Sequence, residues 1–223
     1  MIKAVIFDFD GTLSDRQKNA YMIYDYMMRP YFEGYSDIEY EAVLQDMLTY
    51  DDNGTIKLEY RLETFLKKYG DHFPEGFQKE FIAYYSDHMY QYTELKEETI
   101  EVLEALYGNY KLGLVSNGGS LSQHSKIDHV GISKYFDEII VSDDVGYNKP
   151  QREIFDLMAQ RLGVQNEECM MVGDVFSTDI LGAIRAGMMP VWIAKHLENP
   201  YKYYQGHRIT DLREVITILN TQS

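Results

Sequence analysis

The stretch Val5-Ile6-Phe7-Asp8-Phe9-Asp10-Gly11-Thr12-Leu13 sets two carboxylates directly behind an apolar run. That run, Ala4 to Phe7, is typical of a buried strand. A carboxylate at the end of a buried strand is costly unless other groups compensate its charge. A hard cation with oxygen ligands is one such partner, and ligands bind at the carboxyl ends of strands in open α/β sheets. The stretch therefore predicts a metal-assisted site at a sheet edge.

Length and charge limit the classes to which this chain of 223 residues can belong. It has no run of about 18 apolar residues, so no membrane span is expected. The net charge of −15 argues against nucleic acid or an anionic membrane as a partner. The single cysteine, Cys169, excludes an intrachain disulfide, and its apolar neighbours favour a buried core residue over a catalytic thiol. Because no leader precedes the first strand, we expect a cytoplasmic protein, either a monomer or a homodimer.

Residues from about 15 to 93 show helical spacing and little strand signal. Ser36, followed three residues later by Glu39, is typical of a capping box at the start of a helix. Helices are expected over 38–50, 56–69 and 77–90. A long insertion without strands has no place in a sheet, so we expect a helical cap domain over residues 15–96.

From about residue 97, short apolar runs alternate with helical segments. The expected strands are 111–115, 138–142, 168–173 and 190–194, and the expected helices are 98–107, 120–130, 151–162, 177–186 and 211–220. Such alternation predicts a parallel, doubly wound sheet. The predicted fold class is therefore α/β, with a Rossmann-like core of residues 1–14 and 97–223 and an inserted helical cap.

Polar residues follow four of the expected strands. In chain order they are Asp8 and Asp10, then Ser116 and Asn117 before Gly118 and Gly119, then Lys149 before Pro150, and finally Gly173-Asp174 with Asp179 five residues on. The ends of parallel strands meet at one edge of a doubly wound sheet, so we expect these residues in one cluster. Carboxylates, a lysine, a hydroxyl and backbone amides together are suited to metal-assisted phosphoryl transfer.

These motifs give the chain its resemblance to the haloacid dehalogenase superfamily of phosphohydrolases. The matching residues, in the family order and spacing, are Asp8-Phe9-Asp10-Gly11-Thr12, Ser116-Asn117, Lys149-Pro150, and Gly173-Asp174 with Asp179. The resemblance covers residues 1–14 and about 97–195. Residues 15–96 are similar to the small helical cap of the family in position and length, and they carry no motif. Many relatives have a proline-glycine pair where the chain re-enters the core, whereas this chain has Tyr92 to Glu98, which leaves the hinge position open.

The resemblance implies a role for each matching residue. Asp8 would be the nucleophile that forms an aspartyl-phosphate, and Asp10 would be the general acid and base. Lys149 would offset the negative charge between nucleophile and phosphate, and Asp179 would lie behind the metal ligands, orienting a metal-bound water or Lys149. The implied Mg²⁺ ligands are Asp8, the backbone carbonyl of Asp10, and Asp174. The implied contacts to the substrate are Thr12, Ser116, Asn117 and Gly118.

The implied function is a Mg²⁺-dependent phosphatase for a small phosphorylated metabolite. A sugar phosphate, phosphoglycolate or a nucleoside monophosphate would fit, and the stretch from Asp179 to Ile193 is most similar to the phosphoglycolate-phosphatase and pyrimidine-nucleotidase branches. A phosphomutase similar to β-phosphoglucomutase would use the same Asp8 and Asp10 but exclude water. A dehalogenase is disfavoured because those relatives lack the second acid, Asp10. A non-catalytic binding protein on the same fold would need a blocked or lost site, and the sequence shows no such loss.

Overall fold

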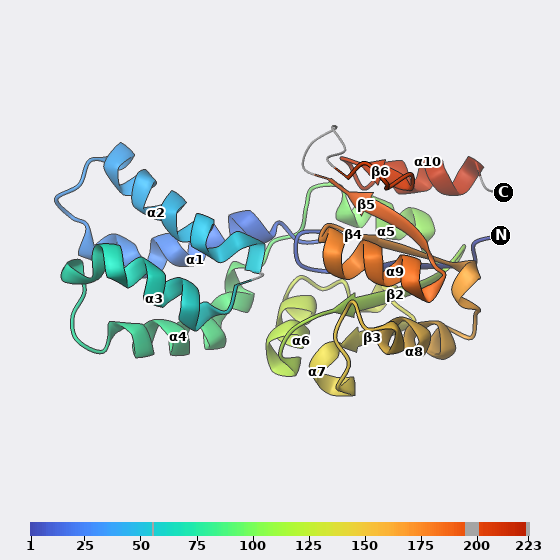
Figure 1. Ribbon diagram of the computed structural model, residues 1–223, viewed down its shortest axis with the longest axis horizontal. Coiled ribbons are helices and arrows are strands. Elements are labelled where there is room, and N and C mark those ends of the chain that lie inside the picture. The colour runs from blue at the N-terminus through green and yellow to red at the C-terminus, as the bar shows by residue number, and fades with distance from the viewer. Residues whose placement is uncertain (55, 195–200, 222–223) are drawn as a thin grey trace. The chain divides into compact units, whose positions relative to one another are not determined.

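The computed structural model describes residues 1–54, 56–194 and 201–221 (Figure 1). The chain divides into a core unit, Met1–Ser14 with Leu95–Ser223, and a cap unit, Asp15–Glu94. The cap was expected to extend to residue 96, two residues further. The reason for the difference is that Ser14 forms an antiparallel bridge with Leu95, and the Lys96 N–H donates to the Leu13 carbonyl at 3.0 Å.

The core unit is built on one parallel sheet of six strands in the order β3-β2-β1-β4-β5-β6. The strands are β1 (Ala4–Phe7), β2 (Lys111–Ser116), β3 (Glu138–Val141), β4 (Cys169–Gly173), β5 (Met189–Ile193) and β6 (His207–Ile209). Phe7 of β1 pairs with Leu114 of β2 on one side and Val172 of β4 on the other. The doubly wound parallel sheet predicted from the alternation is thus confirmed. Strand β6 was not expected, because three residues are too few to show a strand pattern.

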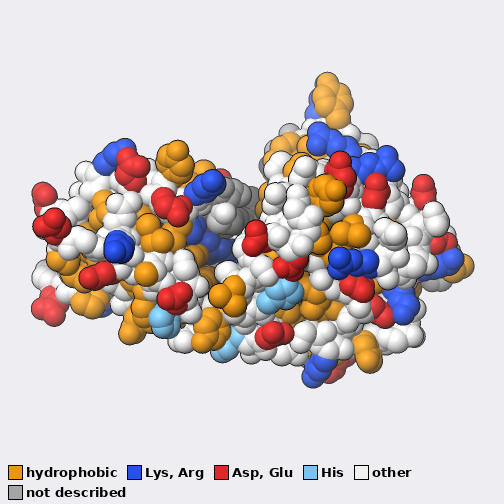
Figure 2. Space-filling model, turned by 90° about the horizontal axis from the view of Figure 1, so that it is seen from below, with side chains coloured by type: hydrophobic (Ala, Val, Ile, Leu, Met, Phe, Trp, Pro, Cys, Tyr) orange, Lys and Arg blue, Asp and Glu red, His pale blue; other side chains and the backbone are white. Residues whose placement is uncertain are grey.

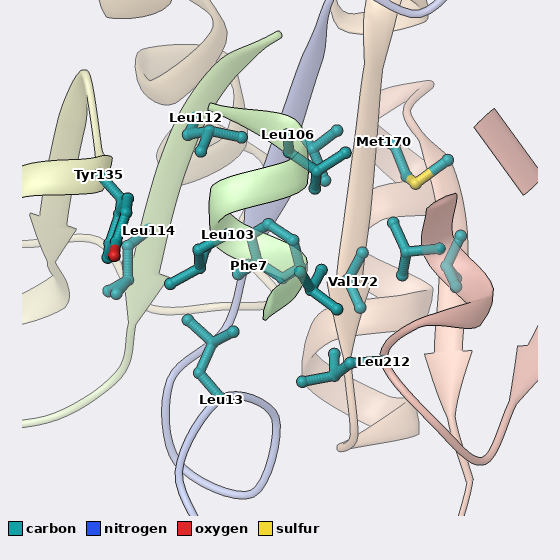
Figure 3. Close-up of a cluster of buried hydrophobic side chains, with 14 of the residues drawn as sticks. Phe7, Leu13, Leu103, Leu106, Leu112, Leu114, Tyr135, Met170, Val172 and Leu212 are labelled. Atoms are coloured by element: carbon teal, nitrogen blue, oxygen red, sulfur yellow. The ribbon is translucent and has the colours of Figure 1, made fainter. Parts of the chain in front are cut away.

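Helices cover both faces of the sheet, because successive side chains of a strand point to opposite faces. Val5 and Phe7 pack with α5 (Thr99–Leu106) and α10 (Glu214–Thr221), and Ala4 and Ile6 pack with α8 (Arg152–Leu162) and α9 (Leu181–Ala186). Figure 3 shows Leu103 of α5 beside Phe7 in the first of these clusters. Cys169 lies in the second cluster and is fully buried, as predicted.

Three further helical segments shape the loops at the carboxyl edge of the sheet. They are α6 (Ser120–His129), α7 (Ser142–Val145) and a π-helical turn, η7 (Phe176–Ile180). The helix expected over 177–186 is therefore divided, with η7 preceding α9. Within η7, Asp179 accepts the backbone N–H of Val175 at 2.9 Å. Residues 142–145 were expected to end a strand and continue as a loop, but they form a single helical turn instead.

The cap unit contains four helices that bury a core of their own. They are α1 (Arg16–Met28), α2 (Asp37–Asp51), α3 (Leu58–Tyr69) and α4 (Phe77–His88). Tyr24, Phe65 and Phe81 are among the fully buried side chains. The predicted capping box is confirmed, since the Ser36 N–H donates to Glu39 Oε2 at 2.9 Å.

On the face drawn in Figure 2, acidic side chains alternate with basic and apolar ones. None of the helices formed by the described residues combines the length and apolar character needed to cross a bilayer.

A buried charge cluster lies inside the cap unit. The Asp51 carboxylate accepts Arg16 Nη2 at 3.0 Å, the Tyr24 hydroxyl at 2.8 Å and the Gly54 N–H at 2.9 Å, and it is also paired with Arg61. Asp51 is 2% exposed, and both arginines are buried. One carboxylate thus pairs with two guanidinium groups within the cap.

Replacing this carboxylate should destabilise the cap strongly. In Asp51→Ala two buried cations lose their counter-ion, and we expect the free energy of unfolding to fall by about 3–5 kcal/mol. Urea denaturation followed by circular dichroism measures this change. Asp71→Ala, at an exposed position, is the matched control and should change stability by less than about 0.5 kcal/mol. Equal stability of the two variants would show that the cluster does not stabilise the cap.

Candidate active site

The loop after β1 brings the first two carboxylates to the edge of the sheet. Asp8 follows β1 directly, and its N–H donates to the Val172 carbonyl of β4 at 2.9 Å. Gly11 has a φ of +88°, a conformation that L side chains rarely adopt. A Cβ at this position would also collide with the carboxylate of Asp174. Glycine is thus required both by the turn and by the close approach of two loops.

Lys149 joins three of the predicted residues. Its ammonium group donates to Asp8 Oδ1 at 2.6 Å and pairs with Asp179 Oδ1 at 2.8 Å. Its backbone is held by Asn117, whose side-chain amide donates to the Lys149 carbonyl at 2.9 Å and accepts the Lys149 N–H at 2.8 Å. The loops that follow β1, β2, β3 and β4 are therefore connected through one lysine.

Three carboxylates surround this lysine. Oxygens of Asp8, Asp174 and Asp179 all lie within 4.8 Å of one another. Burial raises the pKa of Asp8 to about 8, with the charges of Asp179 and Asp174 adding to the effect and Lys149 opposing it. Burial also raises the pKa of Asp174 to about 6, with Asp179 adding to the effect and Lys96 and Lys149 opposing it. Negative charge therefore exceeds positive charge in this cluster.

The donor chemistry of the cluster suits a hard divalent cation. Carboxylate oxygens are the ligands that Mg²⁺ prefers, and the cation would supply the positive charge that Lys149 alone does not. Of the three carboxylates, Asp179 is held on both oxygens, by Lys149 and by the Val175 N–H. Asp8 is likewise held on both oxygens, by Lys149 and by Thr12, so these contacts do not rank the carboxylates as ligands.

Asp10 lies apart from this cluster and has a lysine of its own. Its Oδ2 accepts Lys126 Nζ at 2.5 Å and Gln123 Nε2 at 2.9 Å, both from α6. Neither residue belongs to a motif of the sequence. Their spacing of three places both side chains on one face of the helix after the second motif, which is the signal the sequence carries for them. That spacing does not reveal Asp10 as the shared partner.

The expected substrate contacts have clear places in the structure. The Thr12 hydroxyl is fully buried and donates to Asp8 Oδ2 at 3.2 Å, so it helps to hold this carboxylate. Ser116 ends β2 and is 1% exposed. The Gly118 N–H donates to Ser142 Oγ at 3.0 Å and is thus engaged within the protein. Contacts of Thr12, Ser116, Asn117 and Gly118 with a substrate stay predictions.

One supporting residue lies on strand β5. Trp192 of β5 is largely buried, and its indole N–H also donates to the backbone carbonyl of Asp174 at 3.0 Å. This bond fixes the backbone that carries one of the site carboxylates. The apolar run around residue 192 predicts burial, but it contains no signal for a hydrogen bond to another loop.

The arrangement has a defined chemical capacity. A buried carboxylate held by a lysine can act as a nucleophile towards an electrophilic phosphorus, and a second acid on the same loop can move protons. Positive charge from Lys149 reduces the repulsion between the attacking carboxylate and an anionic phosphate.

Three of the known proteins that are similar to this chain are two enzymes compared by sequence and one solved structure. Over its whole length the chain is 27% identical to glyceraldehyde 3-phosphate phosphatase of Pyrococcus furiosus, 95% of which is covered. Over 54% of each chain it is 34% identical to the pyrimidine 5′-nucleotidase YjjG of Escherichia coli. The crystal structure of the putative HAD-hydrolase YfnB from Bacillus subtilis, bound to magnesium, superimposes with a TM-score of 0.79 at 22% identity and covers 98% of this chain and 99% of that one. This last likeness shows a shared fold.

The family pattern described as haloacid dehalogenase-like hydrolase matches residues 5–193. This range includes all four strand-end loops that carry the site, and it agrees with the resemblance found in the sequence. The chain belongs to the haloacid dehalogenase-like hydrolase family.

Proposed function

We propose that this protein is a Mg²⁺-dependent phosphatase that hydrolyses a small phosphorylated metabolite through an aspartyl-phosphate on Asp8. The observation that carries the proposal is the buried Lys149, which holds Asp8 at 2.6 Å beside the carboxylate cluster. The names of the relatives, a glyceraldehyde 3-phosphate phosphatase and a pyrimidine 5′-nucleotidase, support a phosphomonoester as substrate. A cytoplasmic location is part of the same proposal.

In the first step, a carboxylate oxygen of Asp8 attacks phosphorus while the bond to the ester oxygen breaks. Asp10 begins this step protonated and gives its proton to the departing oxygen, so the products are an alcohol, the aspartyl-phosphate and an ionised Asp10. Lys149 lowers the repulsion between Asp8 and the phosphate and keeps Asp8 oriented.

In the second step, water attacks the phosphorus of the aspartyl-phosphate. Asp10 takes a proton from the water as the bond between phosphorus and the Asp8 oxygen breaks. The products are inorganic phosphate, a free Asp8 carboxylate and a protonated Asp10, ready for the next cycle.

Mg²⁺ would be held by the side chains of Asp8 and Asp174 and by the backbone carbonyl of Asp10. Bound there, it would neutralise charge on the phosphate oxygens and on the carboxylates around Lys149. Asp179 and the backbone clamp of Asn117 keep Lys149 in place. Ser116 and the backbone N–H of Asn117 would hold phosphate oxygens.

Removing the nucleophile should abolish turnover. We expect Asp8→Asn to lower Mg²⁺-dependent phosphate release by a factor of about 10³ or more, because the neutral amide cannot form the phosphorylated intermediate. The measurement is phosphate release from glyceraldehyde 3-phosphate, phosphoglycolate, hexose phosphates and pyrimidine nucleoside monophosphates, with Mg²⁺ or with EDTA. Asp128→Asn, at an exposed position, is the matched control.

Two results would contradict this proposal. Near-native activity of Asp8→Asn would show that Asp8 is not the nucleophile. Interconversion of hexose phosphates by the wild-type protein without phosphate release would indicate a phosphomutase.

Stability without Mg²⁺ should fall as the pH rises. In the folded state the pKa values of Asp8 and Asp174 are about 8 and about 6, both above the ordinary value of 3.8. Between pH 3.8 and about pH 8 the folded protein binds more protons than the unfolded chain, so the free energy of unfolding decreases as the pH rises. Thermal unfolding in EDTA should therefore show a lower Tm at about pH 8 than at about pH 5.

Mg²⁺ competes with these protons, so its stabilising effect should be larger at the higher pH. Asp8→Asn removes one of the titrating groups and should flatten the pH dependence of the Tm in EDTA. Two results would contradict this prediction. The Tm in EDTA could rise with pH, or its pH dependence could be the same in the wild type and in Asp8→Asn.

A further inference from the structure

Two buried side chains of α6 converge on one oxygen of Asp10. Gln123 and Lys126 both donate to Oδ2, and the side chain of Lys126 is only 6% exposed. The ammonium group also lies 5.6 Å from the centre of the Phe9 ring, where a cation is attracted to the aromatic face. The core unit thus encloses a second lysine beside the first catalytic loop, separate from Lys149.

Packing alone does not account for a lysine at position 126. A buried ammonium group loses its hydration, and an apolar side chain of similar volume would fill the same space at lower cost. The Asp10 carboxylate is the ion-pair partner that makes the charge tolerable. Each acid of the first motif therefore has its own cation, Lys149 for Asp8 and Lys126 for Asp10.

The start of α6 is held firmly against the neighbouring loops. Gly118 has a φ of +144°, and a Cβ there would lie 2.7 Å from Gln123 Nε2, so the loop passes directly over this side chain. The Ser120 N–H donates to Asp143 of α7 at 3.1 Å. These contacts fix the start of the helix that carries the two donors.

We propose that Gln123 and Lys126 are positioning residues for proton transfer by Asp10. The inference rests on the proposed function, in which the Asp10 carboxyl protonates the leaving oxygen and later accepts a proton from water. Both donors bind the same oxygen, so together they fix the orientation of the carboxylate plane. Proton transfer requires heavy-atom distances of about 2.6–3.2 Å, and a carboxylate that rotates freely spends less time within that reach.

The leaving group distinguishes this role from a general structural one. An alkyl phosphate needs a proton on its departing oxygen, whereas 4-nitrophenyl phosphate releases a stable phenolate without one. We expect Lys126→Met to lower kcat/KM for an alkyl phosphate about 10²-fold, and Gln123→Leu about 10-fold. For 4-nitrophenyl phosphate both variants should lose less than about 3-fold, because kcat/KM ends at formation of the aspartyl-phosphate.

The second step gives an independent signature. Attack of water needs Asp10 as a base for every ester, so Lys126→Met should show a burst of nitrophenol followed by slow turnover. Lys126→Arg keeps the charge and should recover part of the activity on the alkyl ester. Lys134→Met and Gln160→Leu, at exposed positions of the core unit, are the matched controls and should leave both esters unaffected. Equal losses on both esters, or no loss on either, would overturn the proposal.

A double-mutant cycle tests the contact without turnover. Urea unfolding midpoints are compared for the wild type, Asp10→Ala, Lys126→Met and the double variant. If Lys126 holds Asp10, the shift caused by Lys126→Met becomes smaller once Asp10 is alanine. Additive shifts would overturn the proposal. A third outcome separates the two proposals. If the shifts are coupled but the wild-type protein hydrolyses no ester, the contact between Lys126 and Asp10 is established, whereas the phosphatase and the proton-transfer role are both rejected.

Discussion

The ion pair between Lys149 and Asp8 is the interaction on which the rest of the site depends. Both groups are buried at the carboxyl edge of the sheet, and neither charge is well placed there without the other. Asp179 holds the lysine from behind, and Asn117 holds its backbone. The parallel sheet brings these residues together from four separate loops, so a change in any loop would alter the environment of the same ammonium group.

The charged side chains of the site form two separate clusters, one around Lys149 and one around Asp10. Around Lys149, burial raises the pKa of Asp8 and Asp174, and neighbouring carboxylates add to the effect, so the cluster is suited to a divalent cation. Around Asp10, the carboxylate and Lys126 balance each other. Two acids separated by a single residue in the chain thus have different surroundings.

The sequence was sufficient to predict those features of the fold and the site that depend on periodicity and on the positions of strand ends. The sheet follows from alternating apolar runs, and the residues after β1, β2 and β4 meet because parallel strands end at one edge. The partners of Asp10 could not be predicted, since the direction in which a side chain of α6 points depends on how that helix packs. Strand β6, the turn of α7 and the division of the helix at η7 were missed for a related reason. Each is too short to show a period. The turn of α7 illustrates how such elements contact distant segments, since its Asp143 accepts the Ser120 N–H.

The bridge between Ser14 and Leu95 closes the core where the cap departs and returns. The Asp15 N–H donates to the Glu94 carbonyl at 3.0 Å, so a hydrogen bond holds the two ends of the inserted segment 15–94 together. An insertion whose ends already meet can change in length and composition at little entropic cost to the framework that carries it. The whole insertion can therefore be exchanged or remodelled in evolution while the sheet and its loops are inherited intact.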